Sequence, residues 1–226
     1  MRETKPMILY YHPLSSYCWK VLIALYEQGI AFDRAMMEDP GVAETWLALW
    51  PLGKFPILRD EARDQTVAEA SIIIEYLGQH GSGPFHPIPD DPAEALEVRL
   101  LDRLFDNYVM TPMQKIVADR LRPDEARDPH GVGEARILLG KAYALLEDRI
   151  GARQWAAGNS FTLADCAAAP ALFYADKVEP MRGGFPALAA YLDRLEARPS
   201  FARVLEEKEP WWHMFPYAQE AADRQQ

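Results

Sequence analysis

Glu69, Ala70 and Ser71 stand directly before an amphipathic run and have the chemistry to hold a small zwitterion. Apolar residues recur from Ile72 to Leu77, which predicts a helix that begins near Ala70. The free N–H groups and positive dipole end of such a helix favour an anion such as a carboxylate. The Glu69 carboxylate beside it can hold an ammonium group, so the two sites together suit an α-amino acid head group. The simpler alternative is that Glu69 and Ser71 only cap the helix.

A second chemical feature is the turn Lys54-Phe55-Pro56, which precedes the apolar pair Ile57-Leu58. Proline at the first residue of a strand costs no ladder hydrogen bond, and it pushes Phe55 into an extended conformation. If the Phe55–Pro56 bond is cis, the Phe55 N–H and C=O groups would form a free strand edge. A short extended peptide could pair with that edge.

Ser15 and Ser16 lie between the end of a predicted strand and the start of a predicted helix. Backbone N–H groups and the helix dipole stabilise negative charge at such a place. The alternative is that one of these serines is only the N-cap of the helix, a role worth about 1 kcal/mol.

The first 81 residues contain the elements that would position these groups. Short runs rich in β formers alternate with amphipathic stretches. This order predicts a βαβ unit followed by a hairpin and a helix. The expected strands are 7–11, 30–36, 57–59 and 65–67, and the expected helices are 16–28, 42–50 and 70–79. Residues 1–81 are therefore predicted to form a thioredoxin-like α/β domain.

After a boundary rich in glycine and proline at residues 81–92, strand signals disappear, and residues 90–226 are predicted to be all-helical. A long amphipathic helix is expected from Leu96, disturbed at Pro112, and a loop is expected over residues 122–133. Thr162 and Asp165 form a capping box before an alanine-rich helix that contains Pro170. The fold class is thus α/β plus all-α.

The tail Trp211–Tyr217 carries four aromatic rings, which would form an exposed apolar patch unless they pack on something. One interpretation is that the rings dock against the helical domain without a function. The other is that they line the hydrophobic half of a substrate site.

Composition excludes several classes of partner. Lys+Arg 24 against Asp+Glu 34 gives a net charge of −10, which argues against nucleic acid and anionic membranes. No apolar run of 18 residues and no secretory signal is found, so a cytoplasmic protein is expected. The two cysteines and five histidines show no ligand spacing, so we predict no metal.

Residues 50–58 and 69–77 resemble two motifs of the glutathione transferase superfamily. These motifs are a turn with a proline and a Glu-Ser pair before a helix that ends in Tyr-Leu. Lys5–Tyr10 followed by Ser15–Val21 looks like the opening of the serine-type classes, particularly zeta, and Phe161–Asp165 is similar to the capping box of the helical domain. The resemblance implies glutathione as co-substrate and a homodimer. Glutathione would be bound by Lys54, Phe55, Pro56, Glu69, Ala70 and Ser71.

By the same resemblance Ser15 aligns with the catalytic serine that donates a hydrogen bond to the glutathione sulfur. Tyr10 and Tyr11 are rivals because other classes use a tyrosine near the end of the first strand. Cys18 is a rival because thiol-dependent classes use a cysteine in this helix, although it falls on the apolar face, where cysteine is inert. The chain departs from the pattern at Ala70, where the family has serine, and at Tyr17, where zeta has cysteine.

Two classes of function follow from this resemblance. The first is an enzyme that adds the glutathione thiol to a small hydrophobic electrophile, or that isomerises or reduces through a transient adduct. The second is a non-catalytic or glutathione-independent binding protein on the same fold, since fold does not fix function. The pocket for the second substrate is expected from Tyr108, Met113, Trp211 and Trp212.

Overall fold

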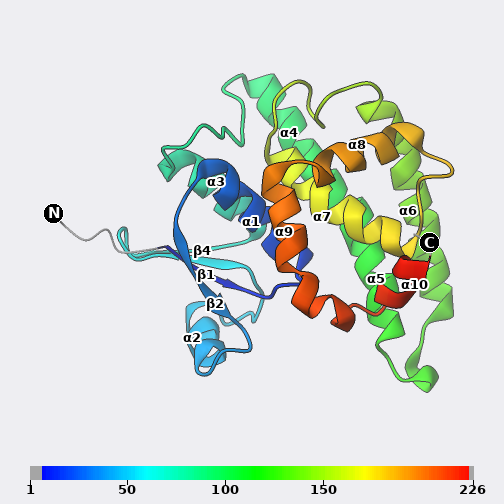
Figure 1. Ribbon diagram of the computed structural model, residues 1–226, viewed down its shortest axis with the longest axis horizontal. Coiled ribbons are helices and arrows are strands. Elements are labelled where there is room, and N and C mark those ends of the chain that lie inside the picture. Colours follow the sequence, from blue (N-terminus) through cyan, green and yellow to red (C-terminus); the bar gives the residue numbers. More distant parts are fainter. Residues whose placement is uncertain (1–6, 224–226) are drawn as a thin grey trace.

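A computed structural model of the chain describes residues 7–223. Lys5 and Pro6, which belong to the N-terminal motif, lie outside these residues. The chain forms two parts that lie side by side, a sheet with helices on the left of Figure 1 and a group of helices on the right. Their order along the chain confirms the predicted fold class of a thioredoxin-like domain followed by helices.

Four strands form one mixed sheet in the order β2-β1-β3-β4. They are β1 (Met7–Tyr11), β2 (Phe32–Met36), β3 (Ile57–Asp60) and β4 (Gln65–Ala68). β1 is parallel to β2 and antiparallel to β3, and β3 and β4 form the hairpin expected across the charged turn. Leu9 and Leu58 face each other in register and are both fully buried, so this pair anchors the centre of the sheet.

Three helices accompany the sheet, α1 (Ser16–Gln28), α2 (Val42–Leu49) and α3 (Ala70–His80). α1 makes the crossover between the two parallel strands. It ends at Gly29, whose φ of 64° is a left-handed conformation that glycine adopts without a steric cost.

The described residues beyond β4 contain no strand, only an isolated pairing of Trp155 with Gly158. The helical part comprises α4 (Pro92–Leu104), the π-helix η1 (Phe105–Met110), α5 (Thr111–Arg120), the short 3₁₀ turn η2 (Asp124–Ala126), α6 (Pro129–Ile150), α7 (Leu163–Val178), α8 (Pro186–Glu196), α9 (Pro199–Glu207), the 3₁₀ turn η3 (Glu209–Met214) and α10 (Ala218–Asp223).

The disturbance predicted near Pro112 takes the form of the π-helix that precedes it. Pro112 has no N–H to donate to the preceding turn, and beside it the Thr111 N–H and hydroxyl both donate to the Asp106 carbonyl, the hydroxyl at 3.0 Å. The loop expected over residues 122–133 is wrong at its end, because α6 already begins at Pro129. Asp128 caps this helix by accepting from the Gly131 N–H at 2.8 Å.

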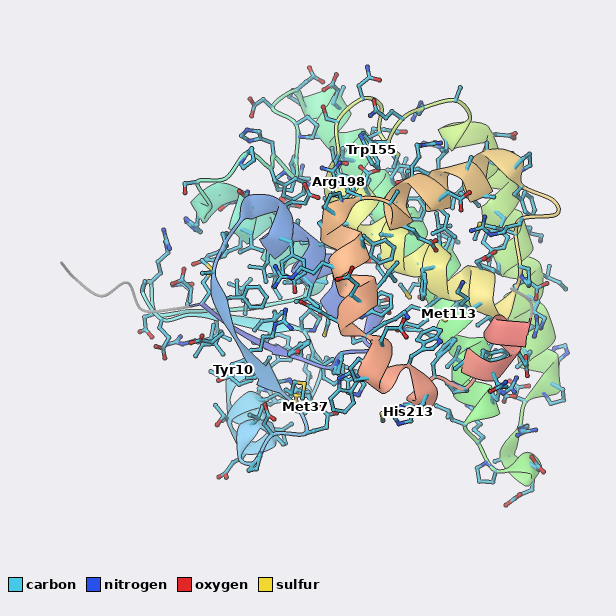
Figure 2. The ribbon with its side chains drawn as sticks, in the orientation of Figure 1. Tyr10, Met37, Met113, Trp155, Arg198 and His213 are labelled. Carbon is cyan, nitrogen blue, oxygen red and sulfur yellow. The ribbon has the colours of Figure 1, made fainter. Side chains whose placement is uncertain are left out.

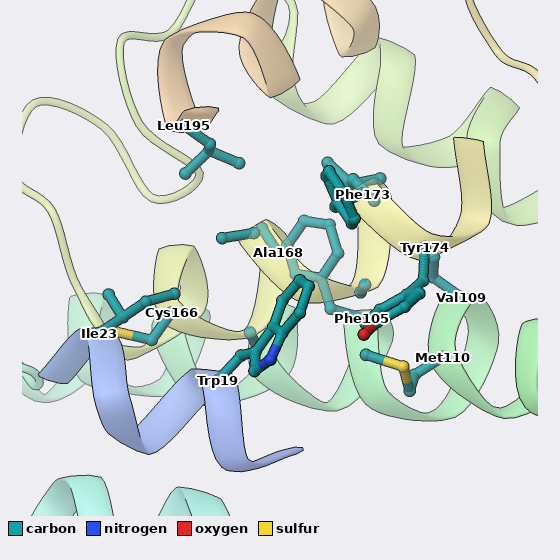
Figure 3. Packing of buried hydrophobic residues seen from close by; sticks show 14 of the residues in the cluster. Trp19, Ile23, Phe105, Val109, Met110, Cys166, Ala168, Phe173, Tyr174 and Leu195 are labelled. Carbon is teal, nitrogen blue, oxygen red and sulfur yellow. The ribbon is translucent and has the colours of Figure 1, made fainter. Parts of the chain in front are cut away.

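α7 lies at the centre of the helical part (Figure 1). The capping box is present at its start, where the Asp165 carboxylate accepts from the Thr162 N–H at 2.8 Å. Trp19 of α1 reaches across to α7, and its ring lies 5.5 Å from Phe173 and 4.7 Å from Tyr174 (Figure 3). The two parts therefore share one hydrophobic core.

The aromatic tail packs on this core. Phe215 and Tyr217 are buried, and the Trp212 ring lies 5.7 Å from Phe173 and 4.7 Å from Phe215. The tail thus docks against the helical part near the end of α7, and whether it also serves a substrate site stays a prediction.

Candidate functional site

A cleft of about 910 Å³ lies between the sheet part and the helical part. It is lined by all seven residues that the sequence analysis assigned to glutathione binding and to the sulfur contact, namely Ser15, Lys54, Phe55, Pro56, Glu69, Ala70 and Ser71. Three separate segments of the chain supply them: the start of α1, the turn before β3 and the start of α3. The remaining lining residues come mainly from α4, η1 and α5.

Ser15 is the N-cap of α1 and is half-buried in the cleft. Its Oγ accepts from the Cys18 N–H at 3.3 Å, so the hydroxyl proton itself is free to be donated to a ligand. The loop before it is fixed from both parts, because Trp19 donates to the Pro13 carbonyl at 2.7 Å and Tyr174 donates to the Leu14 carbonyl at 2.8 Å. This places one hydroxyl donor at the positive end of a helix.

The turn before β3 contains a cis peptide bond between Phe55 and Pro56. The Phe55 ring lies between two others, 6.0 Å from His12 and 5.7 Å from Trp46. Trp46 also donates from Nε1 to the Lys54 carbonyl at 3.0 Å. His12 and Trp46 were not singled out from the sequence; Trp46 fixes the backbone of the turn and both rings contact Phe55.

Glu69 precedes α3 with a φ of 71°, a left-handed conformation that is costly for a residue with a side chain. Such a residue carries about 1–3 kcal/mol of strain and is found most often at functional sites. The Glu69 side chain is exposed at the cleft. The first N–H groups of α3 follow it, so an acidic group and a row of N–H donors stand side by side, as the sequence predicted.

A buried ion cluster forms the floor of the cleft, and the sequence analysis missed it. The Lys20 side chain is fully buried, and its Nζ donates to Asp102 at 2.7 Å and to Asp106 at 2.8 Å. It also donates to the Ser71 hydroxyl at 3.0 Å. Arg103 covers the cluster and contacts both carboxylates, at 2.5 and 2.6 Å. The cluster ties α1 and α3 to α4 and η1.

The two carboxylates respond differently to this environment. Burial raises the pKa of Asp102, but attraction to Lys20 and hydrogen bonds from Lys20 and Arg103 outweigh it, so the pKa lies below the usual range. Burial is the largest influence on Asp106 and, with repulsion from Asp102, it raises the pKa of that carboxyl despite Lys20. Burial also raises the pKa of Tyr17, which lines the cleft above the cluster, to about 12, and Asp106 adds to that shift.

Ser71 belongs to this cluster. Its hydroxyl is bonded within the protein, although the sequence analysis lists Ser71 among the residues that would bind glutathione. Its hydroxyl donates to Asp102 at 2.9 Å and accepts from Arg103 at 2.6 Å in addition to Lys20. The Ser71 hydroxyl, which stands next to the position where the family has serine and this chain has Ala70, is therefore already engaged within the protein.

The rival residues for the sulfur contact are buried. Cys18 is fully buried, and burial raises the pKa of its thiol to about 12. Tyr11 is 5% exposed, and burial likewise raises the pKa of its hydroxyl. Tyr10 is 7% exposed. None of the three lines the cleft, which leaves Ser15 as the candidate that does.

The residues expected to form an apolar second-substrate pocket do not line the cleft. Met113, labelled in the helical part in Figure 2, is 3% exposed and belongs to the hydrophobic core. Trp211 and Trp212 lie in the tail, and Tyr108 is an exposed residue of η1. The helical period does not show which side of a long helix faces the neighbouring domain, so the sequence could not place these residues relative to the cleft, and their role in a second-substrate pocket stays a prediction.

Residues 7–223 show no grouping for a metal and no membrane-spanning helix. No three His, Cys, Asp or Glu side chains in this range are grouped so that they could hold a metal ion, and the absence of a metal stays a prediction. No helix in this range has the length and apolar character needed to cross a membrane.

Comparison with known proteins identifies the family. Residues 9–85 match the family described as Glutathione S-transferase, N-terminal domain, and residues 118–194 match Glutathione S-transferase, C-terminal domain. The chain belongs to the glutathione transferase superfamily. The predicted resemblance is thereby confirmed at the level of the superfamily.

Individual members of the superfamily are similar over nearly their whole length. A glutathione S-transferase of Methylobacterium radiotolerans, solved in complex with glutathione sulfonate, is 30% identical with a TM-score of 0.76 and covers 88% of this chain and 94% of its own. FtsZ-localized protein A of Caulobacter vibrioides is 29% identical over 89% of this chain and 92% of its own. Glutathione S-transferase F13 of Arabidopsis thaliana is 26% identical over 88% and 94%.

Proposed function

We propose that this glutathione transferase superfamily member binds glutathione in the cleft and activates its thiol for addition to a small electrophile. The observation that carries the proposal is the gathering of Ser15, the Phe55 turn and the Glu69–Ala70 helix start around one cleft, from three separate segments. Chains with the same fold include one solved with glutathione sulfonate bound.

In the proposed complex each charged group of glutathione contacts a different part of the cleft. The γ-glutamyl carboxylate lies at the first N–H groups of α3, and the ammonium group lies at Glu69, which is exposed to the cleft. Phe55 offers its backbone to the extended part of the peptide. Lys54 stands beside it as a cation for a second carboxylate.

The chemical step that we propose rests on Ser15. A hydrogen bond from its hydroxyl favours the thiolate over the thiol, which lowers the thiol pKa from the free value of about 8.5. The dipole of α1 acts in the same direction. More of the nucleophile is then present at neutral pH. The thiolate attacks the electrophile, while Ser15 remains uncharged and acts only as a donor.

We also propose a homodimer and a cytoplasmic location. An exposed surface for a second copy is available where Ile72 of α3 lies near Leu96 and Leu100 of α4, since the Glu75–Arg99 ion pair at 2.8 Å joins these two helices. The cysteines are both free and buried, which suits a reducing compartment.

Titration calorimetry with glutathione tests the proposal, followed by turnover of an aryl halide. We expect saturable binding at one site per chain and displacement by glutathione sulfonate. Absence of binding at millimolar glutathione would reject the proposal. Binding without turnover of any electrophile would reject the transferase activity alone.

A second candidate function is that of a binding protein without catalysis, because one relative carries the name FtsZ-localized protein A instead of an enzyme name. The calorimetric test separates the transferase from a glutathione-independent binding protein, because only the transferase requires bound glutathione. A reductase that uses its own cysteine is disfavoured by the burial of Cys18.

A further inference from the structure

The two peptide units on either side of Leu14, directly before Ser15, are held at both of their polar ends. The unit before Leu14 has its carbonyl bonded to Trp19 Nε1 at 2.7 Å, and its N–H, which belongs to Leu14, donates to His12 Nδ1 at 3.1 Å. The unit after Leu14 has its carbonyl bonded to the Tyr174 hydroxyl at 2.8 Å. Its N–H, which belongs to Ser15, donates to the His12 carbonyl at 3.0 Å. Four hydrogen bonds therefore set where the Ser15 side chain begins.

The His12 imidazole is the one partner among the four whose role depends on where its proton lies. Because Nδ1 accepts from the Leu14 N–H, it carries a lone pair, and the ring proton is on Nε2. Nε2 lies 3.2 Å from the Glu38 carboxylate, which accepts this N–H and so favours the same tautomer. The ring also stacks on Phe55, 6.0 Å away and inclined by 17°. His12 does not line the cleft, so any effect on a ligand passes through the residues that it holds.

Loss of the acceptor at Nδ1 would leave the Leu14 N–H unpaired in a half-buried loop. A backbone N–H away from bulk water needs a partner, so this peptide unit would turn toward solvent. Ser15 comes next in the chain, and its hydroxyl would move with the unit. A hydrogen bond weakens steeply when it is misaligned, and a displacement of about 1 Å can lower a rate by about a hundredfold.

We propose that His12 is a positioning residue, which sets the direction of the Ser15 hydroxyl toward the glutathione sulfur by accepting the Leu14 N–H at its unprotonated Nδ1. This inference rests on the proposed function. Glu38 assists by holding the proton on the other ring nitrogen. The neutral ring itself neither donates to the sulfur nor takes its proton.

The variants His12→Asn and His12→Gln separate this role from simple packing. An asparagine oxygen can accept from the N–H two residues further along the chain, which is where Leu14 stands. The glutamine amide lies one bond further out, toward Glu38, and does not take the place of Nδ1. Both variants remove the ring from Phe55, so the loss of stacking is common to both. His86→Gln, at an exposed position outside the cleft, is the matched control.

The first readout is the apparent pKa of the thiol of bound glutathione. We expect His12→Asn and His86→Gln to stay within about 0.3 units of the wild type, and His12→Gln to lie about 0.5–1 unit higher, part of the shift expected for Ser15→Ala. The second readout is the affinity for S-methylglutathione, which has no thiol. It should be equal in His12→Asn and His12→Gln, whereas a general distortion of the cleft by glutamine would weaken it.

Equal thiol pKa values in His12→Asn and His12→Gln, or a pKa difference matched by a loss of S-methylglutathione affinity in His12→Gln, would overturn the inference while the proposed function stands. NMR spectra of the imidazole nitrogens give a test on the wild type alone, which holds even if a variant does not fold. At about pH 8, above the usual titration range of imidazole, the proton of His12 should be on Nε2, and a proton on Nδ1 would overturn the inference. A wild type whose bound thiol titrates like free glutathione would overturn the proposed role of Ser15 as well.

Discussion

Position 70 combines a methyl side chain with a free backbone N–H at the start of α3. Ala70 lines the cleft, while the neighbouring Ser71 hydroxyl is bonded to Lys20, Asp102 and Arg103. A carboxylate bound here would receive backbone donors but no hydroxyl. This leaves one hydrogen bond that a single substitution could add.

Ala70→Ser should therefore tighten glutathione binding. One hydrogen bond to a charged group is worth about 1.5–3 kcal/mol, so the dissociation constant should fall by about tenfold or more. Calorimetric titration of the wild type and the variant measures this directly. An unchanged dissociation constant would show that the carboxylate of glutathione does not lie at the start of α3.

The cleft residues found from the sequence share one property, which is that each belongs to a short local motif. Ser15 and Glu69 stand at helix starts, and Pro56 stands at a strand start, so local rules locate them. Lys20 was missed because its partners lie 82 and 86 residues away. A signal existed: Asp102 and Asp106 share the side of the helix that carries Leu101 and Phe105, and buried acids need a counter-charge.

At the scale of elements, the Lys20 cluster fastens α1 and α3 to α4. Lys20→Met should destabilise the protein by about 3–5 kcal/mol, because it leaves two carboxylates in a buried site with Arg103 as the remaining cation. Urea unfolding measures the loss. Lys141→Met, on the exposed side of α6, is the matched control and should change stability by less than about 0.5 kcal/mol.

The same variant has an expected pH dependence. The pKa of Asp102 is lowered in the wild type, so its contribution to stability is present above the ordinary value of about 3.9 and is lost as the pH falls through the folded pKa. The difference between wild type and Lys20→Met should therefore narrow as the pH falls, because protonation of Asp102 and Asp106 removes the buried negative charge in both proteins. A difference that widens on acidification would contradict this account of the cluster.

Most helices and strands could be predicted because their apolar periods are strong, as in α1 with Val21, Leu22 and Leu25. The start of α6 was missed because Gly131 and Gly133 suggest a loop, although Asp128 followed by Pro129 is a common helix start. The π-helix was not predictable in form. Pro112 indicates a break in hydrogen bonding but does not determine how the preceding turn adjusts.

At the scale of the whole molecule, the proposed dimer has a surface of defined composition. Leu96 is 70% exposed, Ile72 54% and Leu100 41% in the single chain. Ile72 comes from the sheet part and the leucines come from the helical part. A second copy placed there would bury apolar residues from both parts of the chain.

Leu96→Glu should convert the dimer to a monomer, because a charge would be buried without a partner. Light scattering should give about twice the 25.6 kDa chain mass for the wild type and the chain mass for the variant. Leu121→Glu is the matched control, since Leu121 is equally exposed, at 69%, but lies at the end of α5. A wild type that remains monomeric at micromolar concentration would contradict the dimer.

We propose that the sheet part and the helical part, by closing around one cleft, favour the thiolate form of glutathione next to the Ser15 hydroxyl. The most direct measurement is a spectroscopic pH titration of the thiol of enzyme-bound glutathione, in the wild type and in Ser15→Ala. We expect an apparent pKa below the free value of about 8.5 in the wild type, and a value about 1–2 units higher in the variant. A bound thiol that titrates like free glutathione in both proteins would contradict the account.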